Sequence, residues 1–196
     1  MYGTKQSTEV SWFQPVPEKS LELIRATGVG HSDAILDAGG GASTLVDNLL
    51  ADGFRDVSVL DISARALAES QRRLGDRAAD VRWIETDVTR FEPERRYALW
   101  HDRAVFHFLT DAADRDRYVQ ALMKSLREEG HLVLSTFGPE GPLKCSGLEI
   151  CRYDVAHLQE LFGGVFELCS HEIEDHETPG GAAQQFLYSW WQLRHG

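Results

Sequence analysis

The stretch Ile35-Leu-Asp-Ala-Gly-Gly-Gly-Ala-Ser-Thr44 predicts the fold of the chain around it. Its first residues form a short apolar run, typical of a buried strand, and three consecutive glycines follow. Residues 43–51 then bring leucine and valine back at helical spacing. Glycines let a ligand approach the backbone closely, and the first turn of a helix offers free amides. This order of strand, glycine turn and helix is typical of proteins that hold a nucleotide.

Strand and helix patterns alternate along most of the chain. Apolar or alternating segments predict strands at residues 34–38, 56–62, 81–85, 97–100 and 130–137. Helical spacing predicts helices at residues 20–26, 43–51, 63–74, 114–127 and 154–162. Ser63 and Asp154 stand where each can cap its helix by accepting a hydrogen bond from a free amide. Strands separated by helices predict a parallel sheet that is covered by helices on both faces.

Two longer strand patterns, at residues 166–174 and 185–193, follow the last helix. Only residues 175–184 lie between them. A connection of this length cannot form the crossover that joins parallel strands, so we expect an antiparallel hairpin. The chain has no internal repeat, low-complexity segment or linker. We therefore expect a single α/β domain spanning residues 1–196.

Composition and charge exclude several classes of protein. A chain of 196 residues is long enough for one domain with a full hydrophobic core. Its formal net charge of −11 disfavours nonspecific contact with nucleic acid or an anionic membrane, because like charges repel. No apolar run reaches the roughly 18–20 residues of a membrane span, and the first residues resemble no signal peptide. We therefore expect a cytoplasmic protein that binds neither nucleic acid nor membrane.

The three cysteines are an odd number, and none of them forms a C-x-x-C pair. Their spacing argues against a disulfide framework and against a zinc site. The histidines also lack the spacing of a metal motif. We expect reduced thiols in or near the core and no bound metal.

Three features distinguish the glycine turn from that of dinucleotide-binding enzymes. The third glycine of the G-x-G-x-x-G pattern is missing after Gly41. Asp37 stands two residues before the first glycine, where it suits a ligand's ammonium and would repel a pyrophosphate. Acids also recur after the next two strand patterns, as Asp61 and Asp87. Together these features argue against a nicotinamide-dependent oxidoreductase.

The three acids suit a nucleoside that carries an amino acid. One carboxylate can accept from both ribose hydroxyls. Asp87 can accept from the exocyclic amine of adenine, while the amide of Val88 is offered to the ring. Ligands of open α/β sheets bind at the carboxyl ends of the strands, where these acids are predicted to lie. Asp61 or Asp87 taken alone also fits a residue that only caps the helix after it.

The order Asp37-x-Gly39-x-Gly41, Asp61, Asp87 resembles that of the class I S-adenosylmethionine-dependent methyltransferases, and the resemblance covers nearly the whole chain. It implies an α/β, Rossmann-like doubly wound sheet of seven strands, mostly parallel, with a C-terminal antiparallel hairpin pair. The segments "EVSWFQ", "GGGASTLVDNLL", "LDIS" and "WHDRAVFHFL" are similar to a smaller subgroup. That subgroup includes lysine methyltransferases of elongation factor 1A and of citrate synthase, with their bacterial relatives.

The resemblance implies S-adenosyl-L-methionine as the cofactor and assigns residues to it. The carbonyl of His101 would lie near the sulfonium. Trp12 and Phe13, in the N-terminal segment 1–17, would fold over the cofactor as a lid or pack onto the domain as a hydrophobic staple. The other contacts that the similarity implies are Asp37, Gly39, Gly41, Asp61, Ile62, Asp87 and Val88.

Methyl transfer from a sulfonium is an in-line displacement, so the protein mainly aligns donor and acceptor and excludes water. A base is needed only where the nucleophile arrives protonated. Residues 99–109 lack the proline motif of enzymes that methylate planar exocyclic or amide nitrogens. Asp102 and His107 in this segment are the candidate catalytic residues, which would hold or deprotonate the acceptor. Asp102 also fits a partner of Arg103 or a turn cap, and His107 also fits a hydrogen-bonded core residue.

The sequence leaves the methyl acceptor open between a protein lysine and a small molecule. Lysine methylation rests on the subgroup resemblance, and an acidic surface would suit a basic protein. A chain this short has no added docking domain, which would suit a small molecule. Residues 138–152 and 175–184 overhang the strand ends with the N-terminal segment and are expected to select the substrate. The alternative function is a non-catalytic domain that binds the cofactor as a sensor or as a partner's subunit.

Overall fold

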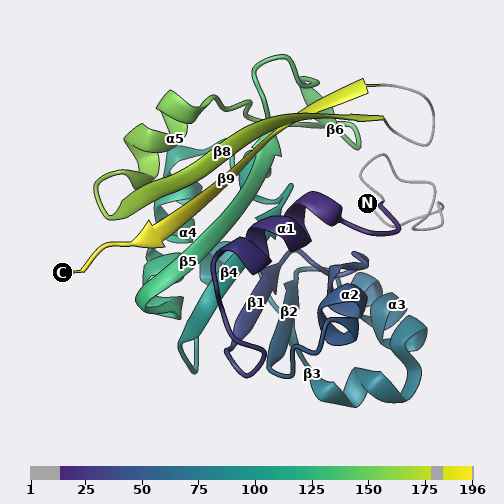
Figure 1. The fold of residues 1–196 in the computed structure, drawn as a ribbon. Helices are drawn as coiled ribbons and strands as arrows, with labels where there is room; N and C mark the ends of the chain where they lie inside the picture. Colours follow the sequence, from purple (N-terminus) through teal and green to yellow (C-terminus); the bar gives the residue numbers. More distant parts are fainter. Residues whose placement is uncertain (1–13, 178–182, 196) are drawn as a thin grey trace.

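The computed structural model describes residues 14–177 and 183–195, which form a seven-stranded mixed sheet between two layers of helices (Figure 1). The sheet order is β3-β2-β1-β4-β5-β9-β8. The strands from β3 to β5 pair in parallel, whereas β9 is antiparallel to both β5 and β8. The predicted fold is confirmed, including its C-terminal hairpin. The strands are β1 Ile35–Ala38, β2 Val57–Asp61, β3 Val81–Glu85, β4 Tyr97–Arg103, β5 Leu126–Phe137, β8 Phe166–Glu177 and β9 Ala183–Leu193.

The helices fall into two layers because successive strand residues point to opposite faces of the sheet. Ile35 and Leu99 pack with the helices α1, α2 and α3, whereas Leu36 and Trp100 pack with α4 and α5. The α-helices are α1 Glu18–Ala26, α2 Leu45–Ala51, α3 Ala64–Leu74, α4 Ala112–Ser125 and α5 Val155–Phe162. Short 3-10 helices are η2 Gly75–Asp80, η3 Val88–Arg90 and η4 Phe106–Phe108, and a small hairpin is formed by β6 Lys144–Cys145 and β7 Leu148–Glu149.

Side-chain caps set where three of the helices begin. The Ser63 hydroxyl accepts from the amide of Ala66 at the start of α3, and Asp154 accepts from the amide of His157 at the start of α5, as predicted. α4 begins two residues earlier than predicted, because Asp111 accepts from the amide of Ala113. These bonds satisfy amides that the helix itself leaves free.

Four strands are longer than their sequence patterns indicate: β4, β5, β8 and β9. β4 continues for three residues past the predicted end at residue 100. His101 and Asp102 interrupt the apolar pattern, but both are buried and hydrogen-bonded within the core. β5 begins at Leu126, four residues before the predicted start, and its pairing with β4 is irregular near that end. Polar residues that find partners in the core therefore hid the extension of β4, whereas the extension of β5 contains the exposed residues Arg127, Glu128 and Glu129, which lack an apolar strand pattern.

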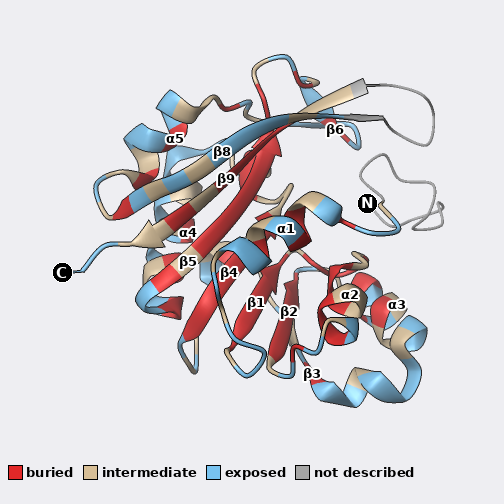
Figure 2. Ribbon diagram, in the orientation of Figure 1, coloured by how far each residue is buried: buried red, intermediate tan, exposed pale blue. Residues whose placement is uncertain are grey.

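The central strands are buried on both sides, as Figure 2 shows for β1, β4 and β5. Parallel sheets of this kind are covered by helices, so their ligands approach at the strand ends. The carboxyl ends of β1 to β4 lie along one edge, and the register places Asp37 beside His101. We call this line of strand ends the strand-end edge; Asp37 and Asp61 from the sequence prediction lie on it.

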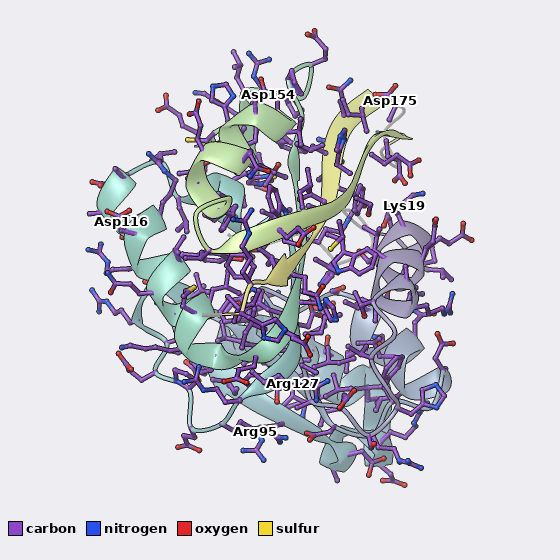
Figure 3. All side chains as sticks on the ribbon, turned by 60° about the vertical axis from the view of Figure 1, so that its left-hand side comes forward. Lys19, Arg95, Asp116, Arg127, Asp154 and Asp175 are labelled. Atoms are coloured by element: carbon purple, nitrogen blue, oxygen red, sulfur yellow. The ribbon has the colours of Figure 1, made fainter. Side chains whose placement is uncertain are left out.

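The charged residues labelled in Figure 3 lie around the outside of the molecule and come from different elements, from Lys19 on α1 to Asp154 before α5. Within residues 14–177 and 183–195, no helix combines the length and the apolar character that crossing a membrane requires.

Candidate active site

The glycine turn after β1 is packed so closely that none of its three glycines has room for a side chain. A Cβ on Gly41 would lie 2.5 Å from Asp61 Oδ2 and 2.7 Å from the Ala66 Cβ. A Cβ on Gly40 would overlap the carboxylate of Asp37. Gly39 has a φ of +75°, which favours glycine, and its missing Cβ would overlap Val105. The turn therefore presents bare backbone between two carboxylates.

Asp37 is buried at the end of β1, and its two oxygens have different surroundings. Oδ1 lies 2.7 Å from Nδ1 of His101 on the neighbouring strand. Oδ2 is directed at Gly40 and has no hydrogen-bond partner among the described residues. A buried carboxylate oxygen without a donor is costly, so this oxygen is suited to receive a donor from a ligand.

Asp61, at the end of β2, fastens the glycine turn to the next strand. Its Oδ2 accepts from the amide of Gly41 at 3.0 Å, and its Oδ1 accepts from the amide of Ser63 at 2.8 Å. Burial raises the pKa of this carboxyl, and the nearby charge of Asp37 adds to the effect. Two buried carboxylates at one turn attract a cation or hydroxyl donors and repel a phosphate.

The ends of β2 and β3 combine a carboxylate with apolar side chains. Asp87 Oδ1 accepts from both the amide and the hydroxyl of Thr89, so Asp87 caps η3, as one of its two interpretations required. Val88 beside it is buried. Ile62, directly after β2, is 70% exposed although its side chain is large and apolar. An exposed aliphatic group near a carboxylate is suited to a flat ring with a polar edge.

Asp102, in contrast, is fully buried and holds the turn that follows β4. Oδ1 accepts from the amide of Val105 at 2.9 Å. Oδ2 accepts from the amide of Phe106 at 3.1 Å and from the hydroxyl of Tyr118 at 2.8 Å. Burial raises the pKa of Asp102 to about 6 despite these donors. Trp100 completes the group by donating from Nε1 to the Tyr118 hydroxyl. Of the sequence interpretations of Asp102, the turn cap describes these contacts.

His107 lies inside the domain on η4 and stacks on Phe137 with a centroid separation of 4.6 Å. Its Nδ1 accepts from the backbone amide of Phe137 at 3.3 Å, and its Nε2 is buried without a hydrogen-bond partner among the described residues. Burial, helped by the charge of Arg103, lowers the pKa of His107 to about 3. The ring is therefore neutral near pH 7.

A buried cluster of three aromatic side chains and one cysteine lies next to Asp102 along the strand-end edge. We call it the β4–β9 cluster, because Arg103 of β4 contacts its β9 residues. It consists of Phe137, Cys145, Phe186 and Tyr188. Arg103 lies against it, since its Nε donates to the Tyr188 hydroxyl at 3.1 Å and its guanidinium stands 5.1 Å from the Phe186 ring centre. Arg103 and Tyr188 both pair with the small Ser135 of β5, which leaves space for that contact.

Sequence reasoning missed the role of Arg103 and of the aromatic side chains around it. These residues lie up to 85 positions apart, and no local motif joins them. Burial raises the pKa of the Cys145 thiol, which keeps it protonated. Trp12 and Phe13 lie outside the described residues. In the part of the chain that the structure describes, no three histidine, cysteine or acidic residues are grouped as metal ligands.

Comparison with known proteins indicates a class of enzyme. Residues 35–130 match the family model described as a methyltransferase domain. The match covers β1 to the start of β5, and so includes the glycine turn and all three strand-end acids. This region therefore indicates a methyltransferase, as the resemblance predicted.

One curated relative is Nodulation protein S of Rhizobium tropici, which is 28% identical over 114 residues. The alignment spans 58% of this chain and only 47% of that protein. Its name describes that protein and not a function of this chain. The lysine methyltransferase subgroup finds no support in this relative.

Two solved structures share the fold. The 1,6-didemethyltoxoflavin-N1-methyltransferase of Burkholderia thailandensis, with bound S-adenosylhomocysteine, superposes with a TM-score of 0.73 at 20% identity, covering 91% of this chain and 78% of that one. The N-methyltransferase NodS of Bradyrhizobium japonicum WM9, in complex with the same ligand, has a TM-score of 0.71 at 17% identity, covering 91% and 87%. At these identities the likeness concerns the fold.

Proposed function

We infer that this protein is an S-adenosyl-L-methionine-dependent methyltransferase whose cofactor lies across the carboxyl ends of β1, β2 and β3. The observation that carries the inference is the pair of buried carboxylates, Asp37 and Asp61, around a glycine turn that excludes side chains. The Oδ2 of Asp37 is ready to accept from an ammonium, and the two charges disfavour a phosphate. S-adenosylhomocysteine in both solved relatives supports the same cofactor.

The order of the strands suggests which residue holds which part of the cofactor. We propose that Asp37 receives the ammonium, Asp61 the ribose hydroxyls and Asp87 the exocyclic amine of adenine. Ile62 and Val88 would contact the ring, and Gly39, Gly41 and the carbonyl of His101 would line the amino-acid part. Trp12 keeps its proposed place in the lid segment 1–17. When bound, the cofactor supplies an electrophilic methyl group, and the protein aligns donor and acceptor and excludes water.

The methyl acceptor then belongs beside β4 and β5, next along the edge from the three acids. Arg103 and the β4–β9 cluster lie there. A guanidinium disfavours the approach of a lysine ammonium, because like charges repel strongly in a partly buried site. Aromatic rings favour a flat or apolar acceptor. We therefore propose a neutral or anionic small molecule in place of a protein lysine.

The named activities of the relatives support a nitrogen on a small molecule. Both solved relatives are described as N-methyltransferases, and one of them holds 1,6-didemethyltoxoflavin. We extend this only as far as the class of acceptor.

We propose that Asp102 and His107 contribute to catalysis by positioning. Asp102 holds the turn that leads from Arg103 to η4. His107 stacks on the Phe137 ring and accepts a hydrogen bond from its amide. A histidine with a pKa of about 3 is a weak base at neutral pH. The nucleophile is therefore expected to arrive unprotonated, and alignment supplies most of the rate enhancement.

The test is methyl transfer from radiolabelled S-adenosylmethionine into an extract of the source cells, separated by size after addition of the purified protein. Gly41→Val, whose new side chain would meet Asp61 and Ala66, is the background control. Label in the low-molecular-weight fraction with the wild type alone supports the proposal. Label in a protein band would overturn the small-molecule acceptor and restore the lysine. Cofactor binding without any transfer would favour a sensor.

A further inference from the structure

A chain of three buried polar side chains crosses the domain from α1 to the glycine turn. Ser20 on α1 lies 2.9 Å from Nε2 of His101 on β4, and Nδ1 of the same ring lies 2.7 Å from Asp37 Oδ1 on β1. None of the three is more than 2% exposed. The chain therefore joins two strands and a helix that are far apart in the sequence.

With Asp37 ionised and the His101 ring neutral, the chemistry of the three groups determines which atom donates. An ionised carboxylate only accepts, so His101 donates its Nδ1–H to Asp37. In the neutral ring Nε2 is an acceptor, and the Ser20 hydroxyl donates to it. A protonated ring would place a second cation beside the carboxylate that is proposed to receive the cofactor's ammonium. The neutral ring with hydrogen on Nδ1 is thus the form compatible with a bound cation.

The fold alone does not account for these polar groups. Burying a polar side chain is unfavourable unless all of its hydrogen bonds are made, and apolar residues would fill the same space without that penalty. The series of hydrogen bonds from Ser20 through His101 ends, however, at Asp37, whose Oδ2 has no partner among the described residues and is directed at Gly40. Each link upstream restricts the rotation of the Asp37 carboxylate. The arrangement is complete only when something donates to that last oxygen.

We propose that His101 and Ser20 are positioning residues that hold Asp37 in the orientation that receives the ammonium of S-adenosylmethionine. This makes α1 part of the cofactor site through its side chains, in addition to the backbone carbonyl of His101. The inference rests on the proposed function. It assigns to His101 and Ser20 a contribution to binding of the amino-acid part alone, with none to the adenosine part.

Two ligands separate this role from a general structural one. S-adenosylhomocysteine carries the amino-acid part, whereas 5′-methylthioadenosine has the same adenosine and sulfur without it. Each is titrated by calorimetry into the wild-type protein and into four variants: His101→Leu, His101→Asn, Ser20→Ala and Ser125→Ala. Asn at position 101 keeps a donor for Asp37, and Ser125 is a buried helical serine bonded only within α4, which makes it the matched control.

His101→Leu is expected to lower the affinity for S-adenosylhomocysteine about tenfold or more, because a charged hydrogen bond to Asp37 is lost. His101→Asn should restore most of that loss, and Ser20→Ala should weaken the same ligand by a few-fold, on the order of one neutral hydrogen bond. The affinity for 5′-methylthioadenosine should stay within about twofold in every folded variant, an expected change below one neutral hydrogen bond. Ser125→Ala should change neither affinity.

Equal losses for both ligands in Ser20→Ala, or no loss in His101→Leu, would overturn the positioning role and leave the proposed function intact. Ser20→Ala removes only one oxygen, so it decides the question even if His101→Leu does not fold. If the wild type binds 5′-methylthioadenosine and S-adenosylhomocysteine with equal affinity, the ammonium has no site at Asp37 and the inference fails. Failure of the wild type to bind either ligand would contradict the proposed function itself.

Discussion

The two halves of the strand-end edge use their buried acids in opposite ways. At the ends of β1 and β2, Asp37 and Asp61 flank bare glycine backbone. One oxygen of Asp37 has no partner among the described residues, and each Asp61 oxygen accepts a single backbone amide, which leaves acceptor capacity on both carboxylates. At the end of β4, Asp102 is just as buried, but its oxygens accept from two amides of the turn and from the Tyr118 hydroxyl. The acids of the first half can still accept hydrogen bonds from a ligand, whereas the acid of the second half stabilises the fold.

This difference teaches how burial should be interpreted in a site of this kind. A buried acid whose hydrogen bonds are complete stabilises the scaffold, and its loss should lower the stability of the domain. A buried acid whose bonds are incomplete stores a preference for a ligand, and its loss should lower affinity first. The predictions below test this division.

The largest expected effect is on stability at the β4 half. Asp102→Ala leaves two amides and the Tyr118 hydroxyl without their acceptor, and should lower the free energy of unfolding by about 3–5 kcal/mol. Asp102→Asn keeps one acceptor oxygen and should lose less. Urea denaturation measures both variants. A loss below about 1 kcal/mol for Asp102→Ala would place Asp102 outside the scaffold, since it is less than one unsatisfied group costs.

His107 makes the same half sensitive to acid. Its folded pKa of about 3 lies below the ordinary value of 6.5, so the unfolded chain binds a proton first as pH falls. The stability contribution is present above pH 6.5 and is lost as pH falls from 6.5 toward 3. Between pH 6.5 and 4.5 the wild type should lose about 2.3 kcal/mol from this group, because one pKa unit corresponds to about 1.36 kcal/mol and half of the unfolded chains already carry the proton at pH 6.5.

The measurement is the slope of stability against pH in His107→Gln compared with the wild type. Asp102 acts in the opposite direction in both proteins, since its folded pKa is raised, and it cancels in the comparison. Parallel slopes would show that His107 is protonated alike in the folded and unfolded states.

At the cofactor half the expected loss is in affinity. Asp61→Ala should remove charged hydrogen bonds to the ribose and weaken S-adenosylhomocysteine by about 1.5–3 kcal/mol, roughly tenfold or more. Calorimetric titration measures the change. Unchanged affinity would remove Asp61 from the proposed contacts.

The smallest expected effect comes from Gly40→Ala. The added Cβ would overlap the Asp37 carboxylate and must displace it, which should weaken the same ligand by about 1–2 kcal/mol, a typical cost of overpacking. Gly164→Ala is the matched control, because a Cβ there meets nothing within 4 Å. Equal behaviour of the two variants in the titration would mean that the turn is not held as described.

The glycine turn and the acids at the ends of β1, β2 and β3 could be predicted from the sequence because their signals are local. Asp37 and the glycines occupy one short stretch, and Asp61 and Asp87 follow apolar strand patterns directly. Periodicity likewise predicted the sheet, its helices and the C-terminal hairpin. The contact between Asp61 and the Gly41 amide, over 20 positions, was already beyond such local signals.

The acceptor half could not be predicted in the same way. Arg103 on β4 meets Tyr188 on β9 over 85 positions, and only the sheet order, with β5 between the two strands, brings these side chains together. Burial also sets the pKa values of Asp102 and His107, which no local pattern shows. Their residue types suggest acid–base chemistry, but their pKa values and partners depend on tertiary packing.

The most direct test of the central claim is a crystal structure of the protein with S-adenosylhomocysteine. The account predicts the ligand across the carboxyl ends of β1, β2 and β3, with its ammonium within hydrogen-bond distance of Asp37 Oδ2, its ribose hydroxyls at Asp61 and its adenine beside Ile62. A ligand bound elsewhere, or an Asp37 carboxylate that makes no contact with the ammonium, would contradict it.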